Sequence, residues 1–469
     1  MTSAKFPVAL ATTFAFGAFL TLSSSLLAAD AASTASPAPA AKTVTFAKDV
    51  APILQARCQE CHHKGAMAPM SLVTYEETRP WAKAIRQRVI ARQMPPWHID
   101  KTVGVQKFKN DISLSDEQIA TIVSWVDAGA PMGDAKDMPA PAVWPAANEW
   151  KASKELGAPD LVVKSEPYTM PAHHQDVWWR PTSDVPLTEP RWVKAVEIRP
   201  GTLAGRRITH HAVAYLVQDD PSSLAPGDAD FGGRAFFMEW AIGKGYDLYR
   251  PDSGKLILPG SQISWDVHIH AVGEEIRDNV EIGIWLYPKG QEPKHRSYLT
   301  GFQALRSFQP GLNPRARAGK NIDLPPNSVT QTDNYTVLER PAQLENFQPH
   351  MHLRGKAMTV EAILPDGTTQ IVSHVDKFNF NWMNNYIYAD DAAPVFPKGT
   401  LIHVTAWYDN TRANPNNPDP DQWVGYGDRT VDEMGHAWMN VTYLSDEEYS
   451  AWAAKHKPNL QTADASSGN

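Results

Sequence analysis

The stretch that decides the fold is Ile-Thr-His-His-Ala-Val-Ala-Tyr-Leu-Val-Gln at residues 208–218, in which a pair of histidines precedes an alternating run at residues 212–218. Such a run is typical of a β-strand. Comparable alternating stretches occur at residues 192–198, 280–287, 359–364 and 401–408, and turn signals such as Pro365-Asp366-Gly367 separate them. This spacing predicts antiparallel β-sandwiches over residues 160–445 rather than alternating strands and helices.

Histidines form three clusters in this β region. His268-Ile269-His270 and His350-Met351-His352 each place two imidazoles on one face of a strand, because residues two apart share a face. The adjacent pair His210-His211 can share a metal only if the strand ends, twists or bulges there. One isolated His-x-His is commonly an ordinary pair, but three clusters and a distant methionine indicate metal binding. Imidazole suits zinc, copper, iron and nickel, and an added thioether favours copper.

The composition is that of a globular protein of several domains. The chain has 469 residues, of which 42% are hydrophobic and 20% charged, which excludes a disordered or multi-spanning membrane protein. A net charge of -8 predicts no basic surface, so nucleic acid is not an expected partner. The two cysteines, Cys58 and Cys61, are too close in sequence to form a disulfide framework.

The first 29 residues have the pattern of a secretory signal peptide. Lys5 precedes an apolar run from Phe6 to Leu27, and the small residues Ala28 and Ala29 follow. An uncleaved membrane anchor is the alternative, because the run approaches spanning length. Residues 30–42 are expected to form a flexible linker. We therefore expect a periplasmic or secreted protein with no membrane span after cleavage.

Residues 43–137 are predicted to form a small haem domain. Cys58-Gln59-Glu60-Cys61-His62 is a C-x-x-C-H motif, in which two thiols bind the vinyl groups of one haem covalently and His62 ligates the iron. A redox C-x-x-C or half of a zinc site is the alternative, but the usual zinc set needs a second cysteine pair. Helices are expected at residues 46–57 and 81–92, and a third begins at Ser115 as cap and stops at Gly129.

This order of helices, with a methionine before the last one, resembles a small cytochrome c over about 90 residues. The resemblance implies that Met94, in Gln93-Met94-Pro95, is the sixth ligand of the haem iron. A His/Met haem is suited to one-electron transfer. The competing ligands are Met67, Met70, Met132 and His98.

The motifs HHAVAYL, DVHIH, PHMHLRGKAM and DEMGHAW, in this order, resemble the copper type II, ascorbate-dependent monooxygenases. That family includes peptidylglycine α-hydroxylating monooxygenase, dopamine β-monooxygenase and bacterial relatives. The resemblance implies two tandem antiparallel, jelly-roll-like β-sandwich domains, each with one copper. The expected fold class is therefore multidomain α plus all-β. The expected parts are a cytochrome c domain at 43–137, a linker at 138–160, copper sandwiches at 161–300 and 301–450, and a tail at 451–469.

The resemblance also implies the ligands of the two coppers. The implied ligands of the first copper are His210, His211 and His268, and His270 is the alternative to His268. The implied ligands of the second copper are His350, His352 and Met434, and His436 is a possible competing ligand. The animal enzymes of the family are rich in disulfides, which this chain cannot form.

The resemblance implies that copper at His350, His352 and Met434 activates dioxygen, and that copper at the first set supplies the second electron. We expect a copper-dependent monooxygenase that hydroxylates a C–H bond of a small-molecule or peptide substrate. The covalent haem c would exchange electrons with a periplasmic donor or acceptor. The alternatives are a haem–copper electron-transfer protein, or a substrate dehydrogenase that passes electrons to the haem without oxygen insertion. The tryptophans Trp178, Trp179, Trp240 and Trp382 are expected to serve mostly as core residues.

Overall fold

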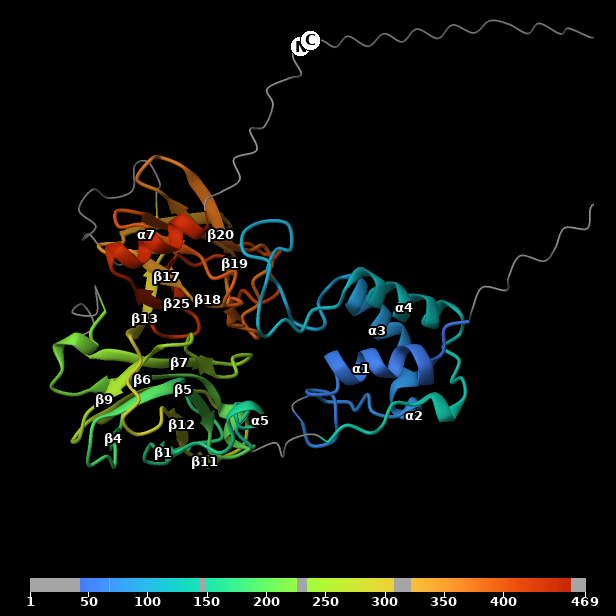
Figure 1. The fold of residues 1–469 in the computed structure, drawn as a ribbon. Helices are drawn as coiled ribbons and strands as arrows, with labels where there is room; N and C mark the ends of the chain where they lie inside the picture. Colours follow the sequence, from blue (N-terminus) through green and yellow to red (C-terminus); the bar gives the residue numbers. More distant parts are fainter. Residues whose placement is uncertain (1–42, 67, 144–148, 226–233, 308–321, 457–469) are drawn as a thin grey trace, which may run out of the picture. The chain divides into compact units, whose positions relative to one another are not determined.

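The structure is a computed structural model that describes residues 43–66, 68–143, 149–225, 234–307 and 322–456 (Figure 1). The chain divides into two compact units, residues 1–43 and 44–469. The predicted signal peptide, the predicted linker at 30–42 and Met67 lie outside the described residues. Strands hold 36% of the residues and helices 17%, which confirms that the chain is mainly β.

The helices predicted in the N-terminal part are present. The first comprises the π-helical turn η1 (Phe46–Val50) and α1 (Ala51–Arg57), and the second is α3 (Ala82–Ile90). The third, α4 (Asp116–Asp127), begins at Ser115, whose side chain accepts from the backbone N–H of Gln118 in a capping box. These helices share a core around Phe46, Leu54, Ile122 and Trp125.

Shorter helical elements lie between and after them. They are α2 (Tyr75–Thr78), η2 (Arg79–Trp81), η3 (Ala135–Asp137), α5 (Ser153–Leu156), α6 (Gly205–Ile208), η4 (Pro221–Ser223) and α7 (Asp446–Lys455).

Two sheets pack face to face in the first half of the β region. One sheet has the order β1-β12-β5-β9, with β8 beside β5, and the other has the order β3-β10-β6-β7, with β4 beside β10. A hydrophobic core that includes Ile198, Ala212, Trp265 and Ile282 lies between them. The strands are β1 (Leu161–Lys164), β2 (Tyr168–Met170), β3 (Val177–Trp179), β4 (Thr182–Asp184), β5 (Arg191–Pro200), β6 (Thr209–Val217), β7 (Ala235–Ala241), β8 (Asp247–Leu248), β9 (Ser253–Ile257), β10 (Gln262–Ile269), β11 (Ile276–Asp278) and β12 (Val280–Leu286).

The second half repeats this arrangement. Strands β13, β25, β17 and β22, with β18 and β21, lie across a second core from the sheet β14-β16-β23-β19-β20. The strands are β13 (His295–Gln303), β14 (Arg306–Ser307), β15 (Asp323–Leu324), β16 (Val329–Val337), β17 (Ala342–Leu344), β18 (Asn346–Met351), β19 (Gly355–Ile363), β20 (Thr369–Val375), β21 (Tyr386–Ile387), β22 (Val395–Phe396), β23 (Leu401–Asp409), β24 (Val424–Gly425) and β25 (Gly435–Tyr443).

The two halves are joined by strand pairing and by a small shared core. The end of β13 pairs in parallel with β9, so one sheet continues from the first half into the second. Val213, Tyr215 and Phe236 of the first half pack against Leu299 and Trp438 of the second. The faces of β6 and β25 that point away from their own cores therefore meet each other.

Three segments are more ordered than the sequence suggests. Residues 153–156, in the expected linker, form α5, and the Trp150 ring before it lies edge-on against Trp285. The expected tail from residue 451 begins inside α7, which Ser445 and Glu448 cap. Trp97 and Ile99, in the expected cytochrome domain, belong to the core of the second half.

Candidate metal centres

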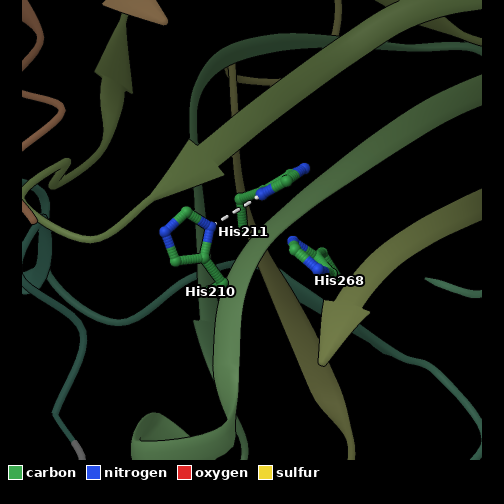
Figure 2. A group of neighbouring side chains, drawn as sticks. All are labelled: His210, His211 and His268. Atoms are coloured by element: carbon green, nitrogen blue, oxygen red, sulfur yellow. Dashed lines mark hydrogen bonds between the residues drawn. The ribbon is translucent and has the colours of Figure 1, made fainter. Parts of the chain in front are cut away.

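A β-bulge brings the adjacent histidines His210 and His211 together. In the pairing of β6 with β10, His268 lies opposite His211, and the next residue, Ile269, lies opposite Thr209. His210 is thus the extra residue of the bulge, which frees its side chain from the normal alternation. The possible ligand atoms of His210, His211 and His268 all lie within 4.8 Å of one another. Figure 2 shows the three rings grouped, two from one strand and one from its neighbour.

The neighbours of His268 leave one of its nitrogens for a metal. Its Nε2 lies 3.0 Å from Asp176 Oδ2, while its Nδ1 is buried without a hydrogen-bond partner. The ring of Trp178 stacks on His268, with centroids 4.9 Å apart and planes 2° apart. His270 is half-buried and does not belong to the group of three. The geometry therefore favours His268 over His270 as the third ligand.

The second candidate set lies on β18 and at the start of β25. His350 stands directly opposite His436 in this strand pair, and both are buried. His352 follows the end of β18, and its Nδ1 lies 3.1 Å from the carbonyl oxygen of Asp432, which leaves Nε2 buried without a partner. Met434, directly before β25, is 8% exposed. The arrangement keeps His436 available as the competing ligand of this set.

A buried network of hydrogen bonds positions His352. The carboxylate of Glu433 accepts hydrogen bonds from the backbone N–H groups of His352 at 2.9 Å and Arg354 at 2.6 Å. Arg354 is 2% exposed, and its guanidinium donates to Asn410 Oδ1 and to the carbonyl of Val431. Burial raises the pKa of Glu433, and the two N–H groups and Arg354 act in the opposite direction.

The two sets of imidazoles approach each other closely. The rings of His211 and His350 form an edge-to-face pair with centroids 5.3 Å apart. Phe380 stacks on His210, with centroids 4.3 Å apart, and meets His352 edge-on at 6.3 Å. The side chain of Phe380 therefore lies between one ring of each set.

Burial keeps these imidazoles neutral. Desolvation, followed by neighbouring histidines, lowers the pKa values of His210, His211 and His350 well below their usual range. Desolvation likewise lowers the pKa of His352 to about 4. Neutral imidazole is the form that binds a metal.

The residues present fit a metal. His210 Nε2, His268 Nδ1, His350 Nδ1 and His352 Nε2 are all buried without a hydrogen-bond partner. Buried polar atoms in folded proteins nearly always have a partner. Four such nitrogens in one region form a donor set that a bound cation would satisfy.

The haem-attachment residues follow the end of α1. The backbone N–H of Cys61 and that of His62 both donate to the carbonyl of Cys58, so the three residues form one tight turn. Cys58 and Cys61 are free thiols, and burial raises both thiol pKa values. His62 Nδ1 lies 3.2 Å from the carbonyl of Met70, an arrangement that leaves Nε2 for an iron. Covalent haem attachment at Cys58 and Cys61 stays a prediction.

The sixth haem ligand stays a prediction. Met94 is half-buried, and Met70 and Met132 pack against the helical core. His98 lies away from that core, because its backbone N–H donates to the Tyr386 hydroxyl in the second half of the β region. This placement argues against His98 as the ligand.

Five residues around the two candidate sets were not predicted from the sequence to support a metal ligand. Asp176 and Phe380 carry no motif, and Trp178 was expected mainly as a core residue. Arg354 and Glu433 lie inside the motifs PHMHLRGKAM and DEMGHAW. Their closeness in sequence to the expected ligands His352 and Met434 is the one signal that could have indicated a role at the site.

Comparisons with known proteins identify no family for this chain. No protein-family model matches it, and no curated protein matches it. A solved structure described as an α-L-fucosidase of Bacteroides ovatus aligns at 8% identity over 64% of this chain and 40% of that one, with a TM-score of 0.16. The VP2 subviral particle of infectious bursal disease virus aligns at 9% identity over 61% and 73%, with a TM-score of 0.17. The chain thus spans about two fifths of the first of these structures.

Proposed function

We propose that this protein is an exported haem- and copper-dependent monooxygenase that hydroxylates a C–H bond with dioxygen. The carrying observation is the buried group His210, His211 and His268, whose ligand atoms lie within 4.8 Å, facing a second buried histidine set. In finer terms, the proposal divides the chain into a cytochrome c domain and two tandem copper-binding β-sandwiches. Bound copper would supply one-electron chemistry, for which imidazole and thioether ligands are suited.

The side chains of the protein have separate tasks in this proposal. The His210, His211 and His268 set would hold the copper that stores an electron, with Asp176 fixing the orientation of His268. The His350, His352 and Met434 set would hold the copper that meets dioxygen, with Asp432 and Glu433 fixing His352. Cys58, Cys61 and His62 would hold the haem that delivers electrons from an exported carrier.

The short approach of His211 to His350 also favours a second candidate function. Rings whose centroids are 5.3 Å apart suit electron passage between two metals, whether or not a substrate is oxidised. A haem–copper electron-transfer protein, or a dehydrogenase that reduces its haem, would use the same contact.

Metal analysis and haem spectroscopy test the proposal. The protein, exported with a haem-maturation system, is expected to contain one iron and two coppers per chain. Its reduced haem should be reoxidised by oxygen only when copper is loaded, and Met434→Ala should abolish this dependence without changing the haem spectrum. Reduction of the haem by substrate under anaerobic conditions would instead support the dehydrogenase, and zinc or no copper would refute both copper functions.

No helix among the described residues is long and apolar enough to cross a membrane. The partners expected in this proposal are a small-molecule or peptide substrate and a periplasmic electron carrier.

A further inference from the structure

One short segment contacts residues of the second metal set and also Asp176 and Trp178, the neighbours of His268 in the first set. This bridging segment, Asp428–Met434, runs between β24 and β25 and ends at the expected thioether ligand. Asp176 and Trp178, in the first half of the β region, connect the segment to the first set. Its contacts with the second set are made within the second half.

Toward the first set, the bridging segment holds both partners of the His268 ring. The hydroxyl of Thr430 donates to Asp176 Oδ2 at 2.8 Å, the same oxygen that lies 3.0 Å from His268 Nε2. The indole N–H of Trp178, whose ring stacks on His268, donates to the carbonyl of Asp428 at 3.2 Å. Asp176 and Trp178 are therefore both tied to the segment.

Toward the second set, the bridging segment holds His352 by its ring and its backbone. The carbonyl of Asp432 accepts from the ring Nδ1, and the Glu433 carboxylate accepts from the backbone N–H. The next residue is Met434, whose carbonyl accepts from the Tyr408 hydroxyl at 3.1 Å. A shift of this segment would move a histidine and the thioether together.

The bridging segment is braced so that its two ends move as one piece. Arg429 and Asp432 form a two-pronged ion pair of 2.9 and 2.6 Å, and the backbone N–H of Asp432 donates to the carbonyl of Arg429 at 2.9 Å. The guanidinium of Arg354 donates to the carbonyl of Val431, at the middle of the segment.

We propose that the bridging segment couples the two metal sets, so that a metal at His350, His352 and Met434 strengthens metal binding at His210, His211 and His268. This inference rests on the proposed function only in its choice of copper. A metal at the second set fixes His352 and Met434, which fixes the bridging segment. The fixed segment holds Thr430 and Asp428 in place, which orients Asp176 and Trp178 on His268. Outer partners of ligand histidines typically change metal affinity by about 10- to 100-fold.

The coupling is tested with a double-mutant cycle on the full-length chain. The affinity of the first set for Cu(II) is measured by competition with a chelator, and its EPR spectrum is recorded, in the native protein, Thr430→Val, His352→Ala and the double variant. His352→Ala disables the second set, and Thr430→Val removes one hydroxyl donor at almost constant volume.

Coupling predicts that His352→Ala lowers the affinity of the first set at least about 5-fold in the native background. The same substitution should lower it less than about 2-fold in the Thr430→Val background. Thr430→Ser keeps the hydroxyl and should behave as the native protein. Thr336→Val, the same change at an exposed position of β16, should leave the cycle and the EPR spectrum unchanged.

Independent effects of Thr430→Val and His352→Ala on the first set would overturn the coupling and leave the proposed function standing. Failure of the native protein to bind copper at either set would overturn both. Asp176→Asn breaks the same link from the other side, so it provides a second test if Thr430→Val unfolds.

Discussion

Asp176 is the side chain with the most direct control over His268. Its hydrogen bonds to His268 and Thr430 lower its pKa to about 2, so the carboxylate is ionised at neutral and mildly acidic pH. An ionised partner on the outer nitrogen fixes the tautomer of the imidazole and raises its basicity toward a metal. The cost of losing this partner should therefore appear in metal affinity.

We expect Asp176→Asn to weaken copper binding at the His210, His211 and His268 set by about 10-fold or more. The amide keeps the shape of the side chain but loses the charge. Chelator competition followed by EPR gives the affinity. Asp391→Asn, which breaks an exposed pair with Lys107, should leave the affinity unchanged. Equal affinities of the native protein and Asp176→Asn would contradict the assigned role.

Phe380 covers His210 and separates it from His352. We expect Phe380→Ala to speed the uptake of copper, because the Phe380 ring stacks on the His210 imidazole and covers one of its faces. Stopped-flow mixing of metal-free protein with Cu(II) measures the rate. Phe380→Trp keeps an aromatic cover and should retain the native rate. An unchanged rate in Phe380→Ala would show that copper enters by another route.

Both faces of β6, β18 and β25 are buried, and β10 is buried on one face and at His268 on the other. One face of each is apolar and belongs to its own sandwich core, as for Ala212 on β6 and Val441 on β25. The other face carries His211, His268, His350 or His436 and meets the opposite sandwich. A polar surface buried between two sheets is costly unless its groups are paired or bind a ligand.

Gly435 shows how tightly the start of β25 is held. A Cβ atom at this position would lie 2.3 Å from the Tyr408 hydroxyl and 3.1 Å from the carbonyl of Ala304. We expect Gly435→Ala to lower the free energy of unfolding by about 1–3 kcal/mol through overpacking. It should also weaken copper binding at the second set, because Met434 is the preceding residue. Denaturant titration and chelator competition measure the two effects.

Gly425→Ala is the matched control for this prediction. The Cβ atom would have its nearest neighbour at 3.7 Å, an ordinary contact. Its effect on stability should stay within about 0.5 kcal/mol. A similar loss of stability in both variants would point to backbone flexibility rather than to the close contact with Tyr408.

The strands and helices were predictable because each depends on a local pattern. The alternating stretch at 208–218 became β6, and Ser115 caps α4 as expected. The sequence showed that His210 and His211 can share a metal only if the strand is irregular there. It could not show that the irregularity is a bulge at His210, because this depends on the register with β10. Asp176, Phe380 and Thr430 could not be predicted, because each acquires its role from a residue more than 75 positions away. The haem and copper assignments stay predictions.

The buried histidines make the stability of the folded chain depend on pH. Burial lowers the pKa values of His210, His211 and His350 well below their usual range and the pKa of His352 to about 4. In the unfolded chain the same residues take up protons below about pH 6.5. Their contribution to stability is therefore complete above about pH 6.5 and is lost as the pH falls toward 4. Buried Glu239, whose pKa is raised to about 7, acts in the opposite direction: its contribution is lost as the pH rises from about 4.5 to 7.

The same lowered pKa values predict how metal binding responds to pH. Protons compete with a metal for imidazole only near or below the imidazole pKa. We expect the copper affinity of the His350, His352 and Met434 set to stay nearly constant in the folded chain between pH 7 and pH 5. The chain unfolded in denaturant should lose affinity steeply below about pH 6.5. Chelator competition at each pH measures both, and a loss that begins near pH 6.5 in the folded chain would contradict the burial argument.

The segment at residues 97–108 ties the N-terminal helices to the far end of the sequence. Ile99 forms a β-bridge with Val375, Phe108 forms one with Tyr388, and Trp97 packs edge-on against Tyr386 at 4.7 Å. For the design of chimaeric proteins, residue 137, the predicted end of the haem domain, is therefore not a suitable place to divide the chain. A chimaeric protein in which another electron carrier replaces the helical module would have to keep residues 97–108 with the β region. Without them the second sandwich would lose three aromatic contacts, which Trp97 and Phe108 make with Tyr386 and Tyr388. Because α4 follows this segment in the sequence but packs in the helical core, no single cut separates the helical module from the β region.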